Sequence, residues 1–146
     1  ADGAVWSWGY GGWGRLGHGD QQDQLLPKKV EALAGQRAIG VSAGAYHSFA
    51  LIADGALWSW GDGDGGKLGH GDESGHAHPR RVEYLQGHRV TQVACGSRHT
   101  VCLLQDADVY TWGDKENGVS GHGGGEGQAF APRFTRPSFR TRGSVK

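Results

Sequence analysis

The sequence is poor in features that whole classes of protein require. It has no methionine, two cysteines, four prolines and a formal net charge of zero. Two cysteines cannot form the disulfide framework of a small secreted domain, and a neutral chain has no overall attraction to nucleic acid or anionic lipid. No apolar run is long enough to span a bilayer, and the first residues lack a signal-peptide pattern. We therefore expect an intracellular chain, cytoplasmic, nuclear or ciliary, that does not enter a membrane.

Glycine and tryptophan are abundant, with 28 and 6 residues respectively. Glycine without a three-residue period excludes collagen, and the tryptophan content argues against disorder. No segment shows a convincing helical period. These features together indicate a folded chain built from strands and turns.

The sequence repeats itself every 52 residues. Segment 2–9 returns as 54–61 and, in weaker form, as 106–113. A period of this size indicates one supersecondary unit copied along the chain. We place the copies at 2–53, 54–105 and 106–124 onward, with 125–146 forming a divergent end of the third copy and a basic tail. Because the sequence opens inside a turn and lacks methionine, we expect it to be part of a larger domain.

Each copy predicts about four short strands. In the second copy, strands at 49–52 and 57–60 flank Asp54-Gly55, a pair typical of a type I′ hairpin turn. We predict two further strands in each copy, at 37–43 and 29–33 in the first and at 89–95 and 81–85 in the second. Four-stranded units at this spacing indicate an all-β fold, a β-propeller of four-stranded antiparallel blades. The length accounts for about three blades, which is a partial ring.

Several motifs suggest chemistry but are explained by the repeat. Gly9-x-Gly11-x-x-Gly14 fits a dinucleotide fingerprint, yet the glycine-rich residues after it will not start the required helix. His18 and His70 occur once per copy, so they diverge around a ring rather than converge on a metal; we expect them to hydrogen-bond loop backbone. We therefore predict no catalytic residues, no cofactor and no metal. Cys95 and Cys102 fall at strand positions that hold alanine in the first copy, so we interpret both as small buried residues.

Two charged features leave alternatives open. The carboxylates of Asp62-x-Asp64 and Asp114-x-Glu116 could bind calcium or a basic partner, or could simply lie in a solvated loop. The tail beyond residue 132 is rich in arginine and could be a nucleic-acid or acidic-partner arm, or a linker. We do not otherwise expect nucleic acid as a partner.

The residues at 6–20, 41–51, 57–72 and 93–103 resemble the repeat of the RCC1 family, the regulator of chromosome condensation. The resemblance covers about residues 1–124. It implies a seven-bladed propeller, which at this period needs roughly 360 residues. Members of the family resemble exchange factors for small GTPases, parts of ubiquitin ligases, chromatin proteins and ciliary scaffolds.

We expect a non-enzymatic protein-interaction module or scaffold that binds through its inter-strand loops. The alternatives are a guanine-nucleotide exchange factor for a small GTPase and a structural subunit of a large assembly. The even spacing leaves no room here for the protruding wedge that exchange activity uses in the family. The expected partners are other proteins, together with remaining blades or a neighbouring subunit. Binding should involve positions that differ between copies, including the loops 21–26 and 73–78. The predicted residues are Tyr10, Trp13, Asp62, Asp64, Glu73, His76, His78, Asp114 and Glu116.

Overall fold

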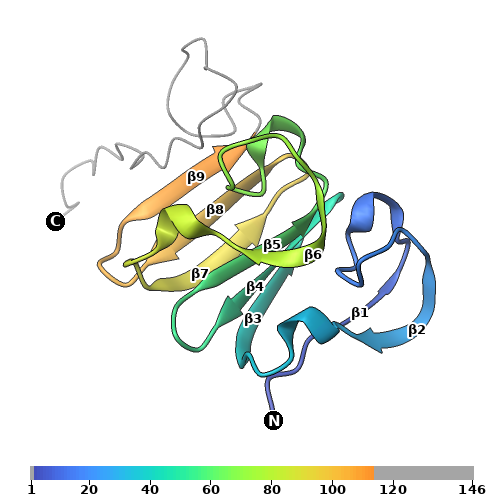
Figure 1. The fold of residues 1–146 in the computed structure, drawn as a ribbon. Coiled ribbons are helices and arrows are strands. Elements are labelled where there is room, and N and C mark those ends of the chain that lie inside the picture. The colour runs from blue at the N-terminus through green and yellow to red at the C-terminus, as the bar shows by residue number, and fades with distance from the viewer. Residues whose placement is uncertain (1, 114–146) are drawn as a thin grey trace, which may run out of the picture.

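The computed structural model describes residues 2–113, which form three antiparallel sheets side by side (Figure 1). We call these sheets blade one, blade two and blade three. Their strands are β1 (Trp6–Gly9) and β2 (Gln24–Lys29) in blade one; β3 (Ala38–Ala43), β4 (His47–Ile52), β5 (Leu57–Gly61) and β6 (His76–Arg81) in blade two; and β7 (Val90–Cys95), β8 (His99–Leu104) and β9 (Val109–Gly113) in blade three. The described residues contain no α-helix, only four 3₁₀ turns: η1 (Gly12–Gly14), η2 (Glu31–Leu33), η3 (Asp64–Gly66) and η4 (Glu83–Leu85).

Blade two is a complete four-stranded meander in the order β3-β4-β5-β6. The register repeats with the period of the sequence: Phe49 pairs with Ser59 in blade two, and Val101 pairs with Thr111 in blade three. Each strand of blade three therefore lies where the repeat places it, and the predicted antiparallel blades are confirmed.

The hairpin between β4 and β5 is confirmed, but its predicted type I′ turn is wrong. Gly55 donates its N–H to the Ile52 carbonyl at 2.9 Å, and only Gly55 in the loop has a positive φ, +88°. This is a three-residue loop in which a type I turn is followed by a left-handed residue. The Asp54 carboxylate accepts the Ala56 N–H at 2.8 Å and closes the turn.

The strands predicted at 29–33 and 81–85 are also wrong. The outer strands β2 and β6 end at Lys29 and Arg81, and the 3₁₀ turns η2 and η4 follow them. Val30 and Leu33 are both buried, and three-residue spacing brings both into the core only in a tight turn. The outer strands instead include parts of the predicted loops 21–26 and 73–78. Each contains a proline, which an edge strand tolerates because one side of it needs no N–H.

The hydrophobic core lies between blades rather than within one. One cluster joins Phe49 and Leu57 of blade two to Cys102, Leu104 and Trp112 of blade three. A second cluster joins the end of blade one to the opposite face of blade two. Each blade is therefore stabilised by its neighbours, as repeat proteins generally are.

Candidate functional site

The loops that connect β1 to β2 and β5 to β6 are fixed by contacts between blades. The carbonyl of Arg15, in blade one, accepts hydrogen bonds from Ser48 Oγ and Trp60 Nε1 of blade two, both at 2.9 Å. The next copy repeats the arrangement at the Lys67 carbonyl. Gly17 lies against the Trp60 indole, where an added Cβ would come within 2.9 Å of Nε1. These loops are therefore rigid supports for whatever side chains they carry.

The repeated histidines hold these loops in place. Ser59 Oγ donates to the Leu68 carbonyl at 2.8 Å, so it accepts from the Nε2–H of His70 at 2.9 Å. Ser7 and His18 repeat the contact in blade one. The predicted bond is therefore not the one formed: each histidine contacts a strand serine, and the serine donates to the loop carbonyl. Burial, with Arg80 second, lowers the pKa of His70 to about 4, so the ring is neutral at pH 7.

The motifs that suggested ligands have structural partners. The glycine-rich segment 9–14 ends in the 3₁₀ turn η1 rather than at the start of an α-helix, and the Gly11 N–H donates to the Asp23 carboxylate at 2.8 Å. A carboxylate already occupies the donor that a phosphate would need. Within residues 2–113 no group of three or more His, Cys, Asp or Glu side chains is arranged to hold a metal ion.

At the junction of blades one and two, three aromatic rings surround one guanidinium. The Cζ atom of Arg15 lies 4.7 Å from the ring centroid of Tyr10, 5.6 Å from Trp13 and 5.2 Å from Tyr46. Trp13 and Tyr46 meet edge to face at 5.8 Å. The rings are 59%, 52% and 39% exposed in the same order. We call these four residues the Arg15 cluster.

The position equivalent to Arg15 in the next copy holds a buried cation paired with a carboxylate instead of an arginine among aromatic rings. Lys67 replaces Arg15 and is 2% exposed, and its Nζ forms a salt bridge with Asp62 Oδ2. Asp62 stands where the first copy has Tyr10. The Asp62 N–H donates to the Tyr46 carbonyl at 2.9 Å, so the two positions are adjacent. Asp62 is therefore committed to a buried cation and is not a free ligand for calcium.

The predicted site residues divide into three groups. Tyr10 and Trp13 meet in the Arg15 cluster, with Asp62 and the exposed Asp64 beside it. Glu73 precedes β6 and His76 and His78 lie within it; the His76 ring contacts His70 at 5.2 Å, and β6 packs against η1, the turn that carries Trp13. Asp114 and Glu116 lie outside the described residues, as does the basic tail.

Sequence reasoning missed Arg15 and Tyr46. A signal for Arg15 existed, because a cation stands at the same place in both copies, as Arg15 and Lys67. Tyr46 had no local signal, since the contact depends on packing between blades.

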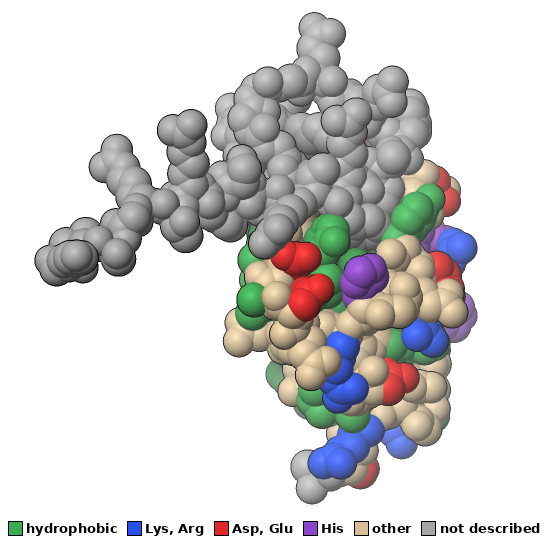
Figure 2. Space-filling model, turned by 90° about the vertical axis from the view of Figure 1, so that its left-hand side faces the viewer, with side chains coloured by type: hydrophobic (Ala, Val, Ile, Leu, Met, Phe, Trp, Pro, Cys, Tyr) green, Lys and Arg blue, Asp and Glu red, His purple; other side chains and the backbone are tan. Residues whose placement is uncertain are grey.

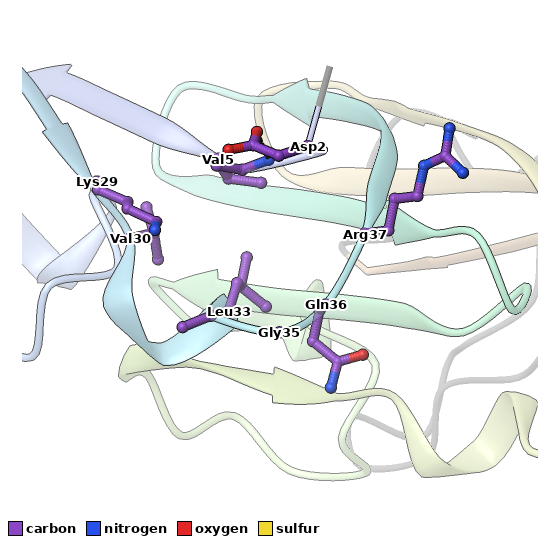
Figure 3. Close-up of a pocket in the computed structure, with 10 residues that line it drawn as sticks. Asp2, Val5, Lys29, Val30, Leu33, Gly35, Gln36 and Arg37 are labelled. Atoms are coloured by element: carbon purple, nitrogen blue, oxygen red, sulfur yellow. Dashed lines mark hydrogen bonds between the residues drawn. The ribbon is translucent and has the colours of Figure 1, made fainter.

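A shallow pocket of about 200 Å³ lies at the end of blade one opposite the Arg15 cluster (Figure 3). Val5, Val30 and Leu33 form its floor, and Lys29 and Arg37 lie at its rim. Its lining residues belong to the repeat, so it is a feature of the scaffold. On the face in Figure 2, acidic, basic and histidine side chains are interspersed without a patch of one sign.

The comparisons with known proteins agree with the repeat geometry. Residues 2–51 and 54–103 match the family model for the regulator of chromosome condensation (RCC1) repeat, and a second RCC1 repeat model matches 38–67 and 90–119. The chain belongs to the RCC1 repeat family. It is 43% identical over 122 residues to the human E3 ubiquitin-protein ligase HERC2 and also to the ultraviolet-B receptor UVR8 of Arabidopsis thaliana. Both matches cover 84% of this chain, but only 2% of HERC2 and 28% of UVR8.

Solved structures support the same fold. Yeast RCC1 (Prp20), in a crystal structure with Kap60 bound, superposes with a TM-score of 0.78 at 27% identity, covering 95% of this chain and 34% of that one. Human WBSCR16 gives a TM-score of 0.71 at 31% identity, covering 77% and 29%. The described residues are therefore blades of an RCC1-type β-propeller and form a partial ring. No helix within the described range is long and apolar enough to cross a membrane.

Proposed function

We propose that the chain is a non-enzymatic protein-interaction module that binds its partner at the loop end of blades one and two. The observation that carries this proposal is the Arg15 cluster, where exposed aromatic rings surround a cation. Aromatic residues and arginine are enriched at the centres of protein interfaces. A scaffold alone does not require these rings, because the next copy folds with Asp62, Gly65 and Arg98 at the same three positions.

The supporting loops are rigid, which lowers the entropy lost on binding. Trp13 takes a φ of +58°, a conformation that costs a bulky residue energy. The equivalent Gly65 has a φ of +69° without that cost. A tryptophan kept in a glycine conformation on the surface supports a binding role.

The relatives support protein partners in a general way. One solved structure is of yeast Prp20p, described together with its binding properties to Gsp1p and histones, and another shows Kap60 bound to yeast RCC1. The chain spans only 2–28% of the curated relatives named above, so ligase, receptor and exchange activities are not assigned to it. A role as exchange factor or assembly subunit would need surfaces beyond these blades.

The experiment is affinity capture from lysate with cross-linking, using the 146-residue chain and a variant that carries Tyr10→Asp, Trp13→Gly and Tyr46→Arg. This variant introduces the residues of the second copy, so we expect the fold to tolerate it. Asp62→Ala is unsuitable, because it would leave the buried Lys67 without its carboxylate. A matched control is Glu31→Ala with Gln36→Ala, which changes polar side chains at and after η2, at the end of blade one opposite the cluster. If the triple variant captures the same partners as the native chain, the placement of the function is wrong.

A further inference from the structure

We infer that the Arg15 cluster recognises a carboxylate, from an aspartate or glutamate in a peptide segment of the partner with apolar neighbours. This inference rests on the proposed function and names the chemistry of its partner. The second copy contains a cation together with its carboxylate partner. There the cation Lys67 has an internal carboxylate, Asp62.

The first copy keeps the cation but has lost the carboxylate. Tyr10 stands at the position of Asp62, and its ring stacks over the Arg15 guanidinium at 4.7 Å. Within residues 2–113 the only salt bridge joins Lys67 to Asp62, so Arg15 has no carboxylate partner among them. A partner carboxylate would therefore supply the charge that the second copy supplies to itself.

Arg15 is already positioned for such a ligand. Its Nε donates to the Gly12 carbonyl at 2.9 Å and its Nη1 to the Ala45 carbonyl at 2.6 Å. The Nη2 atom donates to no described residue, and the side chain is half-buried. Two anchored nitrogens leave little rotamer freedom to lose when the third binds. The flanking rings lower the polarity around the guanidinium and so strengthen a charge-assisted hydrogen bond.

The charges around the cluster favour one carboxylate over a cation or a polyanion. The Arg15 guanidinium already occupies the inner faces of the three rings. A second cation, Lys67, places its Nζ atom 5.6 Å from the Tyr46 ring. A further cation would meet both positive charges. A phosphate-rich ligand would meet two exposed carboxylates nearby, Asp23, which accepts the Gly11 N–H, and Asp64, which follows Asp62. The exposed parts of Tyr10 and Trp13 fit apolar side chains next to the acidic residue.

The test uses three fluorescein-labelled heptapeptides that differ only at the central residue, which is glutamate, glutamine or lysine between two leucines. Fluorescence anisotropy measures their binding to the 146-residue chain at low and high salt. We expect the glutamate peptide to bind about tenfold or more tightly than the glutamine peptide, and to weaken as salt is raised. The lysine peptide should bind more weakly than either.

A variant supplies the missing carboxylate internally. Tyr10→Asp recreates the pairing of the second copy, so it should abolish the preference for glutamate over glutamine. Ile39→Asp, at a 59% exposed position near the start of β3, adds the same charge at the opposite end of the strand from Tyr46 and should leave the preference intact. Thermal melting checks that both variants fold, and if Tyr10→Asp does not fold, the three peptides on the native chain decide alone.

Equal binding of the glutamate and glutamine peptides, stronger binding of the lysine peptide, or no binding of any peptide would overturn the carboxylate inference. None of these results bears on the capture experiment, which tests separately whether this surface binds a protein partner.

Discussion

The indole Nε1 of Trp60 donates a hydrogen bond to the carbonyl oxygen of Arg15, 45 residues earlier in the chain and in the neighbouring blade, at 2.9 Å. Trp112 makes the same bond to the Lys67 carbonyl at 2.9 Å. The repeated tryptophan thus connects each blade to the loop of the blade before it. This one contact explains why the tryptophan and the glycine-rich loop recur together: neither is satisfied within its own blade.

The contact predicts different roles for two tryptophans at equivalent positions. Trp60 is 2% exposed, whereas Trp8 is 59% exposed. Trp60→Ala should cost ~3–5 kcal/mol of unfolding free energy through lost burial and packing, while Trp8→Ala should cost under about 1 kcal/mol. Urea unfolding followed by circular dichroism measures both. Equal costs for the two substitutions would contradict the assigned burial.

The stability should depend on pH through His47, which is buried. Burial, with the Lys67 charge second, lowers its pKa from 6.5 to about 4. The unfolded chain therefore binds more protons than the folded chain between these values, and stability falls as the pH drops from about 6.5 toward 4. The contribution of His47 is at most about 3 kcal/mol. His70 acts in the same direction.

His47→Gln provides the check on this pH dependence. The Nε2–H of His47 donates to Thr100 Oγ1 at 3.2 Å, because that hydroxyl donates onward to the Lys67 carbonyl. A glutamine amide can replace this donor without titrating. Urea midpoints measured from pH 7.5 to pH 4.5 should show a shallower decline in the variant. An unchanged slope would show that His47 does not carry the effect.

Much of the fold could be predicted from the sequence because its period and hairpins are local signals. The 52-residue period defined where each copy begins, and Asp54-Gly55 indicated the β4–β5 hairpin. The tight turns after β2 and β6 were not predicted. Two buried residues three positions apart, such as Val30 and Leu33, do not distinguish a short strand from a 3₁₀ turn in so short a segment. Tyr10 and Trp13 were found as differences between copies. Their contact with Arg15 and Tyr46 could not be predicted, since it exists only once two blades pack together.

The two cysteines should be unreactive in the folded chain. Burial raises the pKa of Cys95 to about 11 and that of Cys102 to about 12, so almost no thiolate exists at pH 8. Reaction with a chromogenic disulfide reagent at pH 8 should be slow in buffer and fast in urea, with two thiols released. Only Cys102 is fully buried as predicted, while Cys95 is half-buried between blades two and three, where its Sγ contacts the Ser42 carbonyl. Rapid reaction of either thiol without denaturant would contradict this protection.

The outward face of blade one should make the isolated 146-residue chain self-associate. Trp8 and Leu25 are exposed there, and Val41 is exposed on β3 of blade two, whereas their counterparts one period later are covered by the preceding blade. Trp60 contacts the Arg15 loop, the Ala77 carbonyl accepts the Gly19 N–H at 3.0 Å, and Val93 packs against the core cluster shared by blades two and three. An exposed apolar surface of this kind, with an open strand edge on β1, favours association.

Sedimentation velocity at increasing protein concentration measures this association directly. We expect the weight-average sedimentation coefficient to rise with concentration for the native chain. It should rise less for a variant with Trp8→Ser, Leu25→Gln and Val41→Thr, because these changes remove apolar area while keeping strand-compatible residues at Trp8 and Val41. The matched control is Tyr84→Ser, which removes an exposed aromatic residue at η4, away from this face. A native chain that sediments as a single monomeric species at all concentrations would contradict the prediction. It would show that the exposed face of blade one is tolerated in water without a neighbouring blade.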